Sequence, residues 1–335
     1  MKIAVIGSGG WGTALAILLH DNGHQITLWS YDRKESENLA STRENPFLKG
    51  IAIPADITCT WDPACVKGKD MVIMATPSFA VRSTATAIKP HLDEQTVLVS
   101  VTKGIESGTG KRMSEITAEV TGKTVAVLSG PSHAEEVGKG VPTGCVAACS
   151  DKTIADLVQE TFMNERFRVY GSPDAVGVEL AAALKNVIAL CAGVCDGLGY
   201  GDNTKALLMT RGLTEVARLG VALGARPDTF AGLAGIGDLI VTCTSMHSRN
   251  RRAGILIGQG KSADEAMKEV GAVVEGYYAA KSAMELAQKV GVDMPITQEA
   301  YAVLYTGKAA RNALGSLMQR RKKNEVEDAG WYGEQ

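Results

Sequence analysis

Two lysines stand where a cation could act on a bound ligand. Lys185 is the one charged residue within residues 181–190, an apolar run that predicts a helix buried over most of its circumference. A lysine in such a helix either extends its amine to solvent or lies in a cleft as a functional group. Lys103 directly follows a predicted strand. Because ligands of open parallel sheets bind beyond the carboxyl ends of the strands, Lys103 is a second candidate.

A glycine-rich loop at the N-terminus is typical of dinucleotide binding. The Gly-x-Gly-x-x-Gly of residues 7–12 follows a predicted strand and opens a predicted helix. Gly7 permits the tight turn, Gly9 lets the backbone approach a pyrophosphate, and Gly12 lets the helix pack on the strand. The helix N-terminus then offers unpaired N–H groups to the phosphates. A purely structural glycine turn is the alternative.

The end of the second predicted strand bears on the choice of cofactor. A cofactor without a 2′-phosphate usually meets an acid there, which holds the ribose hydroxyls. Ser30 and Tyr31 occupy this position, and Asp32 lies just beyond it. Arg33 could face a 2′-phosphate. These residues slightly favour NADP(H), with NAD(H) usable.

A basic cluster in the second half of the chain indicates an anion site. Ser248 is followed by arginines at positions 249, 251 and 252. If Ser248 caps a helix, these cations lie in its first turn, where the helix dipole disfavours each by about 0.3–1 kcal/mol. A bound phosphate would offset that cost, because guanidinium groups match phosphate oxygens. A solvated basic turn is the alternative.

The elements that position these residues fall into two kinds. Strands are predicted at residues 2–6, 25–29, 71–75, 96–101, 124–129 and 146–148, with helices at 13–19 and 79–88 between them. This alternation predicts a parallel sheet covered on both faces. After about residue 175 only helices are expected, at residues 174–194, 203–220, 249–258, 262–269, 274–290 and 297–305.

The expected fold class is therefore α/β. A Rossmann-type domain occupies residues 1–180, and an all-helical, substrate-binding domain occupies residues 181–335. The end of the chain, with Arg320–Lys323 basic and Glu325, Glu327 and Asp328 acidic, predicts a solvated, fraying tail.

Composition narrows the function classes. A net charge of -2 gives no general attraction to nucleic acid or to anionic membranes. Neither a signal peptide nor an uninterrupted apolar stretch long enough to span a membrane is expected, so we predict a cytoplasmic protein. Seven scattered cysteines without a zinc-site pattern indicate reduced core thiols and no metal site. The oligomeric state stays open, a homodimer being the assembly considered.

Taken together, the motifs resemble those of bacterial NAD(P)-dependent glycerol-3-phosphate dehydrogenases. They occur in that family's order over nearly the whole chain. The matching segments are Gly7-Ser8-Gly9-Gly10-Trp11-Gly12, Asn45-Pro46-Phe47-Leu48, Thr102-Lys103-Gly104, Ser129-Gly130-Pro131-Ser132-His133, Leu184-Lys185-Asn186, Gly235-Ile236-Gly237-Asp238, Thr242-Cys243, Ser248-Arg249-Asn250, Val274-Glu275-Gly276 and Met294-Pro295-Ile296.

The resemblance implies an enzyme that interconverts dihydroxyacetone phosphate and sn-glycerol 3-phosphate with NADP(H) or NAD(H), supplying phospholipid synthesis. It makes Lys185 the proton donor and acceptor. The nicotinamide cofactor would contact the glycine loop and Gly10, Trp11, Tyr31, Arg33, Lys103, Ala134, Arg249, Val273 and Glu275. The substrate would contact Lys103, Gly130, Ser132, Lys185, Asp238, Ser248, Arg249 and Asn250. Tyr31 stands where many relatives have Arg or His, which leaves the cofactor preference open.

The expected mechanism is hydride transfer to the C2 carbonyl, with a lysine protonating the developing alkoxide. An ordinary lysine, with a pKa of about 10.4, is a poor base in the reverse direction, so burial and a second cation such as Lys103 are expected to lower the pKa of Lys185. Two other interpretations are a ketopantoate or β-hydroxyacid dehydrogenase and a nucleotide sensor without turnover. The first would not need the arginine cluster, and Lys185 disfavours the second.

Overall fold

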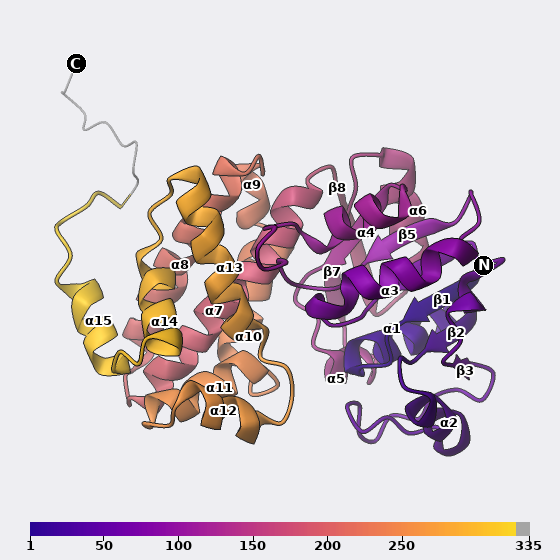
Figure 1. Ribbon diagram of the computed structural model, residues 1–335, viewed down its shortest axis with the longest axis horizontal. Helices are drawn as coiled ribbons and strands as arrows, with labels where there is room; N and C mark the ends of the chain where they lie inside the picture. Colours follow the sequence, from indigo (N-terminus) through magenta and orange to yellow (C-terminus); the bar gives the residue numbers. More distant parts are fainter. Residues whose placement is uncertain (326–335) are drawn as a thin grey trace.

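The computed structural model describes residues 1–325 of the chain. Its first half is built on one eight-stranded sheet, on the right in Figure 1, and its second half is helical, on the left. The strands are β1 (Lys2–Ile6), β2 (Gln25–Trp29), β3 (Thr58–Thr60), β4 (Met71–Met74), β5 (Val97–Ser100), β6 (Val125–Ser129), β7 (Thr143–Ala148) and β8 (Phe167–Ser172). The predicted α/β fold class is confirmed.

The sheet has the order β3-β2-β1-β4-β5-β6-β7-β8. Neighbouring strands pair in parallel from β3 to β6, and β7 also runs parallel to β8. The β6–β7 pair is antiparallel, with Val127 opposite Ala148. The predicted parallel sheet is thus observed, except at this one antiparallel pairing. The three-residue β3 and the edge strand β8 were not predicted.

Alternating side chains bury both faces of the sheet. One face, with Ile3, Val5 and Leu28, packs against α1 (Gly10–Asp21) and α6 (Lys152–Phe162). The opposite face, with Ala4 and Ile6, packs mainly against α3 (Val81–Ile88) and α4 (Met113–Thr121). Two further helices of this half are α2 (Arg33–Thr42) and α5 (Ala134–Val137), and short 3₁₀ helices span Pro63–Val66, Ser78–Ala80 and Lys89–His91.

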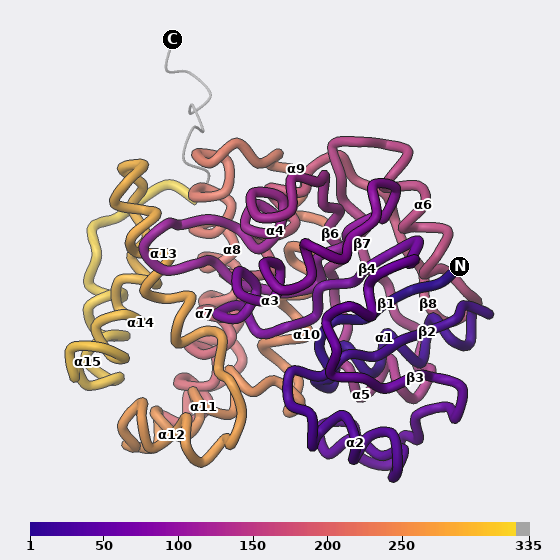
Figure 2. Tube along the Cα trace, turned by 45° about the vertical axis from the view of Figure 1, so that its right-hand side comes forward, coloured from indigo at the N-terminus to yellow at the C-terminus, as the bar shows by residue number. Residues whose placement is uncertain are grey.

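The second half is organised around α7 (Ala175–Gly197), which lies within the helical cluster in both views (Figures 1 and 2). Seventeen of its residues are buried, and the predicted domain division at residue 180 falls within it. The other helices are α8 (Asp202–Ala222), α9 (Pro227–Phe230), α10 (Asp238–Thr244), α11 (Arg249–Gly258), α12 (Ala263–Val270), α13 (Glu275–Val290), α14 (Pro295–Tyr305) and α15 (Ala310–Met318). The predicted helical character of this half is confirmed.

One helix of the described chain, α7, is long and apolar enough to cross a membrane, with a mean hydropathy of 1.7. However, 89% of that apolar window is buried inside the protein. Sheet residues and other helices cover it, as Val178 packs with Val127 of β6 and Leu190 packs with Ala253 of α11. The burial identifies α7 as the core helix of the second half.

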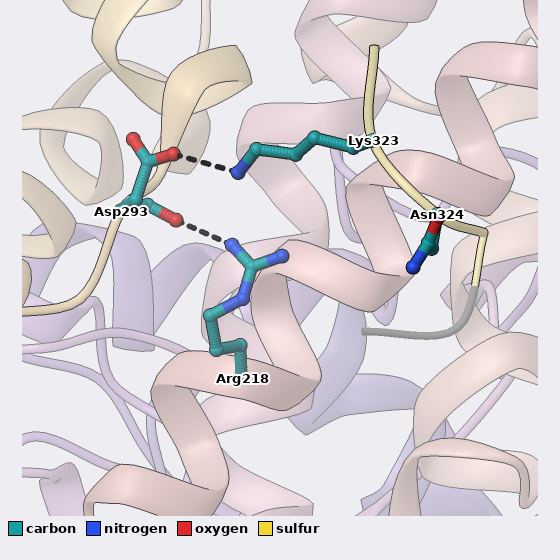
Figure 3. A pocket seen from close by; sticks show the side chains of 4 residues that line it. All are labelled: Arg218, Asp293, Lys323 and Asn324. Carbon is teal, nitrogen blue, oxygen red and sulfur yellow. Dashed lines mark hydrogen bonds and ion pairs between the residues drawn. The ribbon is translucent and has the colours of Figure 1, made fainter. Parts of the chain in front are cut away.

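The segment after α15 is tied to the molecule by Asp293. Arg320 Nη2 binds Asp293 Oδ2 at 2.7 Å. Figure 3 shows two further contacts of Asp293: Lys323 Nζ lies 3.4 Å from Oδ2, and Arg218 Nη1 donates to the carbonyl at 2.5 Å. The basic part of the predicted free tail is thus exposed but anchored. Glu327 and Asp328 lie outside the described residues.

Candidate active site

The two lysines singled out in the sequence meet at one buried carboxylate. Lys185 Nζ donates to Asp238 Oδ1 at 2.6 Å, and Lys103 Nζ donates to Asp238 Oδ2 at 2.7 Å. Asp238 is 1% exposed and Lys185 6%, whereas the Lys103 side chain keeps 23% of its exposure. The fold thus joins the end of β5, the middle of α7 and the first residue of α10.

Thr242 completes this cluster and was missed as a site residue. Its hydroxyl accepts a hydrogen bond from Lys185 Nζ and donates to the Asp238 carbonyl at 2.6 Å. Thr242 follows Asp238 by four residues, a spacing that puts both on one helix face. That spacing in α10 was the signal available in the sequence.

The electrostatics of the cluster favour a lysine that can exchange a proton. Burial lowers the pKa of Lys185 to about 8, with the Lys103 cation acting in the same direction and Asp238 opposing both. Burial alone would raise the pKa of Asp238, but the two lysines lower it below its usual value. Asp238 is therefore an anion that holds two ammonium groups, one of them poorly solvated.

Local sequence explains how Asp238 reaches the cluster. A π-helical turn at Leu233–Gly237 precedes α10, and such turns are frequent at functional sites. Gly235 has no room for a side chain, because a Cβ there would collide with the Phe230 backbone. The glycines of the predicted Gly-Ile-Gly-Asp motif thus allow a tight backbone turn, and this turn places the Asp238 carboxylate next to Lys185.

The glycine loop has the geometry that a dinucleotide needs. Gly7 has φ +126°, and a Cβ there would lie 2.6 Å from the Ala75 carbonyl oxygen. A Cβ on Gly12 would collide with the Gly7 carbonyl. A Cβ on Gly9, in contrast, meets nothing within 4 Å, and no side chain caps α1. The open backbone at this helix N-terminus fits a pyrophosphate.

Of the predicted residues after β2, Tyr31 and Arg33 lie at the surface, whereas Ser30 does not. Tyr31 is 89% exposed. Arg33 Nε donates to Glu37 at 2.7 Å, and its guanidinium lies 5.4 Å from the centre of the Trp61 ring. Ser30 is buried. Arg33 thus contacts Glu37 of its own helix and the ring of Trp61, at the surface.

The start of α11 is capped as predicted, but its arginines differ from one another. Ser248 Oγ accepts a hydrogen bond from the Arg251 N–H at 3.2 Å. The Arg251 guanidinium binds Asp196 at 2.8 Å and the Thr244 carbonyl at 2.6 Å, so it is not free for a ligand. Arg249 is exposed. The expectation that the cluster acts together on an anion is therefore wrong for Arg251, which has a protein partner.

Asn250 is buried in a network that fixes three helices. Its Nδ2 donates to Asn186 Oδ1 at 2.9 Å, and its Oδ1 accepts from the Gly276 N–H at 2.8 Å. Asn186 follows Lys185 directly in α7. The network therefore sets α11 and α13 at a fixed position relative to the lysine.

The remaining predicted residues are distributed over both halves of the molecule. Glu275 Oε2 accepts a hydrogen bond from Ser78 Oγ at 3.0 Å, which joins α13 to the segment after β4. Ser132 Oγ donates to the Gly130 carbonyl at 3.0 Å, and Lys103 Nζ lies 3.4 Å from that oxygen. Trp11, Ala134 and Val273 are partly exposed.

Comparison with protein families accounts for this arrangement. The sequence model of the NAD-dependent glycerol-3-phosphate dehydrogenase N-terminus matches residues 2–155, and the model of the C-terminus matches residues 174–315. The chain belongs to the NAD-dependent glycerol-3-phosphate dehydrogenase family. The family resemblance stated from the motifs is thereby confirmed.

Individual relatives agree with this family over almost their whole length. The chain is 54% identical to a glycerol-3-phosphate dehydrogenase [NAD(P)+] of Fusobacterium nucleatum over 98% of this chain and 99% of the relative. The crystal structure of glycerol-3-phosphate dehydrogenase from Coxiella burnetii superposes with a TM-score of 0.92 at 36% identity, covering 95% of this chain and 99% of that one. A ketopantoate reductase from Ralstonia eutropha, at 17% identity and a TM-score of 0.63, shares the fold alone.

Membership of the glycerol-3-phosphate dehydrogenase family makes the chain an NAD(P)-dependent oxidoreductase. The sequence predictions of an enzyme and of a nicotinamide cofactor are confirmed. The roles of individual residues in the lysine cluster and around the glycine loop stay predictions.

Proposed function

We propose that the chain reduces dihydroxyacetone phosphate to sn-glycerol 3-phosphate, reversibly, with Lys185 as the proton donor. The observation that carries this proposal is the buried ammonium of Lys185, held by Asp238 at 2.6 Å and lying on α7 beside the asparagine network. A positioned acid at the substrate oxygen typically accelerates such a reaction by about 10²–10⁴-fold.

When bound, NAD(P)H would supply a hydride to C2 of dihydroxyacetone phosphate, and NAD(P)+ would accept one from C2 of glycerol 3-phosphate. Lys185, with its pKa near 8, is mostly protonated at neutral pH and gives its proton to the C2 oxygen. Lys103 adds positive charge at the same oxygen and stabilises the developing alkoxide. Asp238 and Thr242 hold the Lys185 amine in place. In the oxidation direction Lys185 takes the proton back.

The substrate phosphate is proposed to bind at the start of α11. Arg249 is exposed there. The N-terminus of a helix also carries the positive end of the helix dipole and N–H groups without partners inside the helix, and both favour a bound anion. Asn250 and Ser248 shape this turn through their hydrogen bonds. Gly130 and Ser132 would border the substrate from the sheet side.

The cofactor is proposed to lie across the glycine loop, with its pyrophosphate at the N-terminus of α1. Gly9 offers the open backbone for it. The other proposed contacts are among those given by the family resemblance: Gly7, Gly10, Trp11, Gly12, Tyr31, Lys103, Ala134, Arg249, Val273 and Glu275. Arg33, which contacts Glu37 and Trp61 instead, is left out of this set.

The proposed cellular role is to supply glycerol 3-phosphate for phospholipid synthesis, in the cytoplasm. The oligomeric state is a separate prediction: a homodimer would elute at twice the chain's 35.3 kDa in size exclusion with light scattering.

The decisive experiment follows the oxidation of NADH and NADPH with a panel of carbonyl substrates. Dihydroxyacetone phosphate should be reduced, whereas dihydroxyacetone should not, because the site that we assign to the phosphate would have no anion to bind. Ketopantoate, which carries a carboxylate and no phosphate, should not be reduced either. Comparable kcat/KM for dihydroxyacetone with and without its phosphate would contradict the phosphate site. Activity on ketopantoate alone would favour the competing enzyme class.

A further inference from the structure

An acid of α2 that was not predicted as a site residue contacts the glycine loop. Ser8, between Gly7 and Gly9, is 5% exposed, and its hydroxyl contacts the hydroxyl of buried Ser30 at the end of β2. The same Ser8 hydroxyl donates to Glu35 Oε1 at 2.9 Å. A carboxylate therefore lies where the loop meets the end of the second strand.

Asp32 is closer than Glu35 to the end of β2 in the sequence, but its side chain does not contact Ser8 in the way that Glu35 does. Its Oδ1 accepts a hydrogen bond from the Glu35 N–H at 2.8 Å, so its carboxylate caps α2. This cap starts α2 at Arg33 and brings Glu35, in the first turn, back to the glycine loop. Glu35, and not Asp32, is thus the acid in contact with the glycine loop.

We propose that Glu35 selects NAD(H) over NADP(H) by accepting hydrogen bonds from the adenosine ribose and repelling a 2′-phosphate. In this fold the ribose lies between the glycine loop and the end of β2. A carboxylate has several acceptor sites, so Glu35 can bind a ribose hydroxyl while it keeps Ser8. The inference rests on the proposed dinucleotide site and departs from the slight preference for NADP(H) expected from the sequence.

The charges around Glu35 support this selection. Arg33, the residue expected to face a 2′-phosphate, is paired with Glu37 and lies over Trp61. A phosphate placed against Glu35 would bring two like charges within a few ångströms, a repulsion that corresponds to roughly a 10–100-fold loss of affinity.

The test is equilibrium titration of NADH and NADPH, followed by nucleotide fluorescence, for the purified full chain and its variants. The unmodified protein should bind NADH at least ~10-fold more tightly than NADPH. Glu35→Gln should close most of this gap by tightening NADPH binding. Glu35→Asp keeps the charge but shortens the side chain, so it should weaken NADH without improving NADPH.

Two further variants separate this effect from its alternatives. Glu37→Gln removes the same charge from the outer side of α2 and should leave the NADH:NADPH ratio unchanged; an effect equal to that of Glu35→Gln would overturn the proposal. Arg33→Ala should also leave the ratio unchanged, and a selective loss of NADPH would assign the 2′-phosphate to Arg33 instead. A tighter complex with NADPH in the unmodified protein would contradict the inference, whereas no binding of either nucleotide would contradict the dinucleotide site itself.

Discussion

At the scale of single residues, the site depends on an asymmetry between two lysines that share one carboxylate. Lys185 is buried, while Lys103 stays partly open to solvent. Burial lowers the pKa of Lys185, and the carboxylate of Asp238 opposes that shift. The more buried amine is therefore the better proton donor, and the more exposed one contributes mainly its charge.

Replacing Lys185 by Ala separates chemistry from binding. Turnover of dihydroxyacetone phosphate should fall by roughly 10²–10⁴-fold, and the loss should appear in kcat. NADH binding should be kept, because the glycine loop lies on the other half of the molecule. Steady-state kinetics with a nucleotide titration measure both. A variant with near wild-type kcat would remove Lys185 from the mechanism and make Lys103 the leading candidate.

The pH dependence of the reaction should report the lowered pKa of Lys185. Reduction needs the ammonium, so its kcat/KM should fall as the pH rises through about 8. Oxidation needs the neutral amine, so its rate should rise over the same range. Lys103→Met removes the neighbouring cation and should move both transitions to higher pH. Profiles that keep their midpoints in this variant would show that another group titrates.

At the scale of elements, close packing between α7 and α11 sets the distance between the lysine and the proposed phosphate site. Both helices present glycines four residues apart, Gly193 and Gly197 on α7 and Gly254 and Gly258 on α11. A Cβ on any of the four would collide with the backbone of the facing helix. The two backbones touch, which holds the start of α11 at a fixed place along α7.

Gly254→Ala tests this contact. Alanine is the better helix former, so any loss of stability measures the collision with the Leu190 carbonyl. We expect a loss of about 1–3 kcal/mol in the free energy of unfolding and a higher KM for dihydroxyacetone phosphate. Gly315→Ala, in α15, is the control, since a Cβ there meets nothing within 4 Å. Equal stability of the two variants would contradict the close packing.

Elements with a strong local pattern could be predicted, and those defined by a distant partner could not. The apolar runs of β1 and β2 and the helix α11 were predicted with their observed bounds. The direction of β7 depends on which strand it joins, and no local pattern encodes that. Likewise, Lys185 and Lys103 were found as isolated cations in apolar or strand-end positions. The pairing of Arg251 with Asp196 depends on tertiary geometry. The Asp32 cap of α2, in contrast, is a local contact that the prediction for this segment did not include.

At the scale of the whole molecule, a buried ion pair between Arg112 and Glu179 connects the sheet half to α7. Glu179, 4% exposed, accepts hydrogen bonds from Arg112 Nη1 at 2.5 Å and from the Ser114 N–H at 2.8 Å. Glu179 lies six residues before Lys185 on the same helix. The contact that joins the halves therefore also sets the position of the catalytic candidate.

Arg112→Ala should be strongly destabilising, because it leaves the Glu179 carboxylate buried without its cation. We expect a loss of about 3–5 kcal/mol in the free energy of unfolding, measured by denaturant titration. Adding Glu179→Gln to this variant should recover part of the loss. Lys152→Ala, which removes an exposed ion pair with Asp156, should leave the unfolding midpoint essentially unchanged. No recovery in the double variant would show that packing, and not charge, dominates there.

The apolar length of α7 has a consequence for how the protein is made. Its partners α11 and α13 are encoded after it, so translation of the stretch up to Val290 takes about 5–20 s once α7 has been synthesised. At the start of that interval, before α8 and α10 are made, a segment as hydrophobic as a membrane anchor has only the preceding sheet to cover it. A ribosome-bound chain stalled just after Gly197 should therefore recruit chaperones or membrane-targeting factors, and one stalled after α15 should release them.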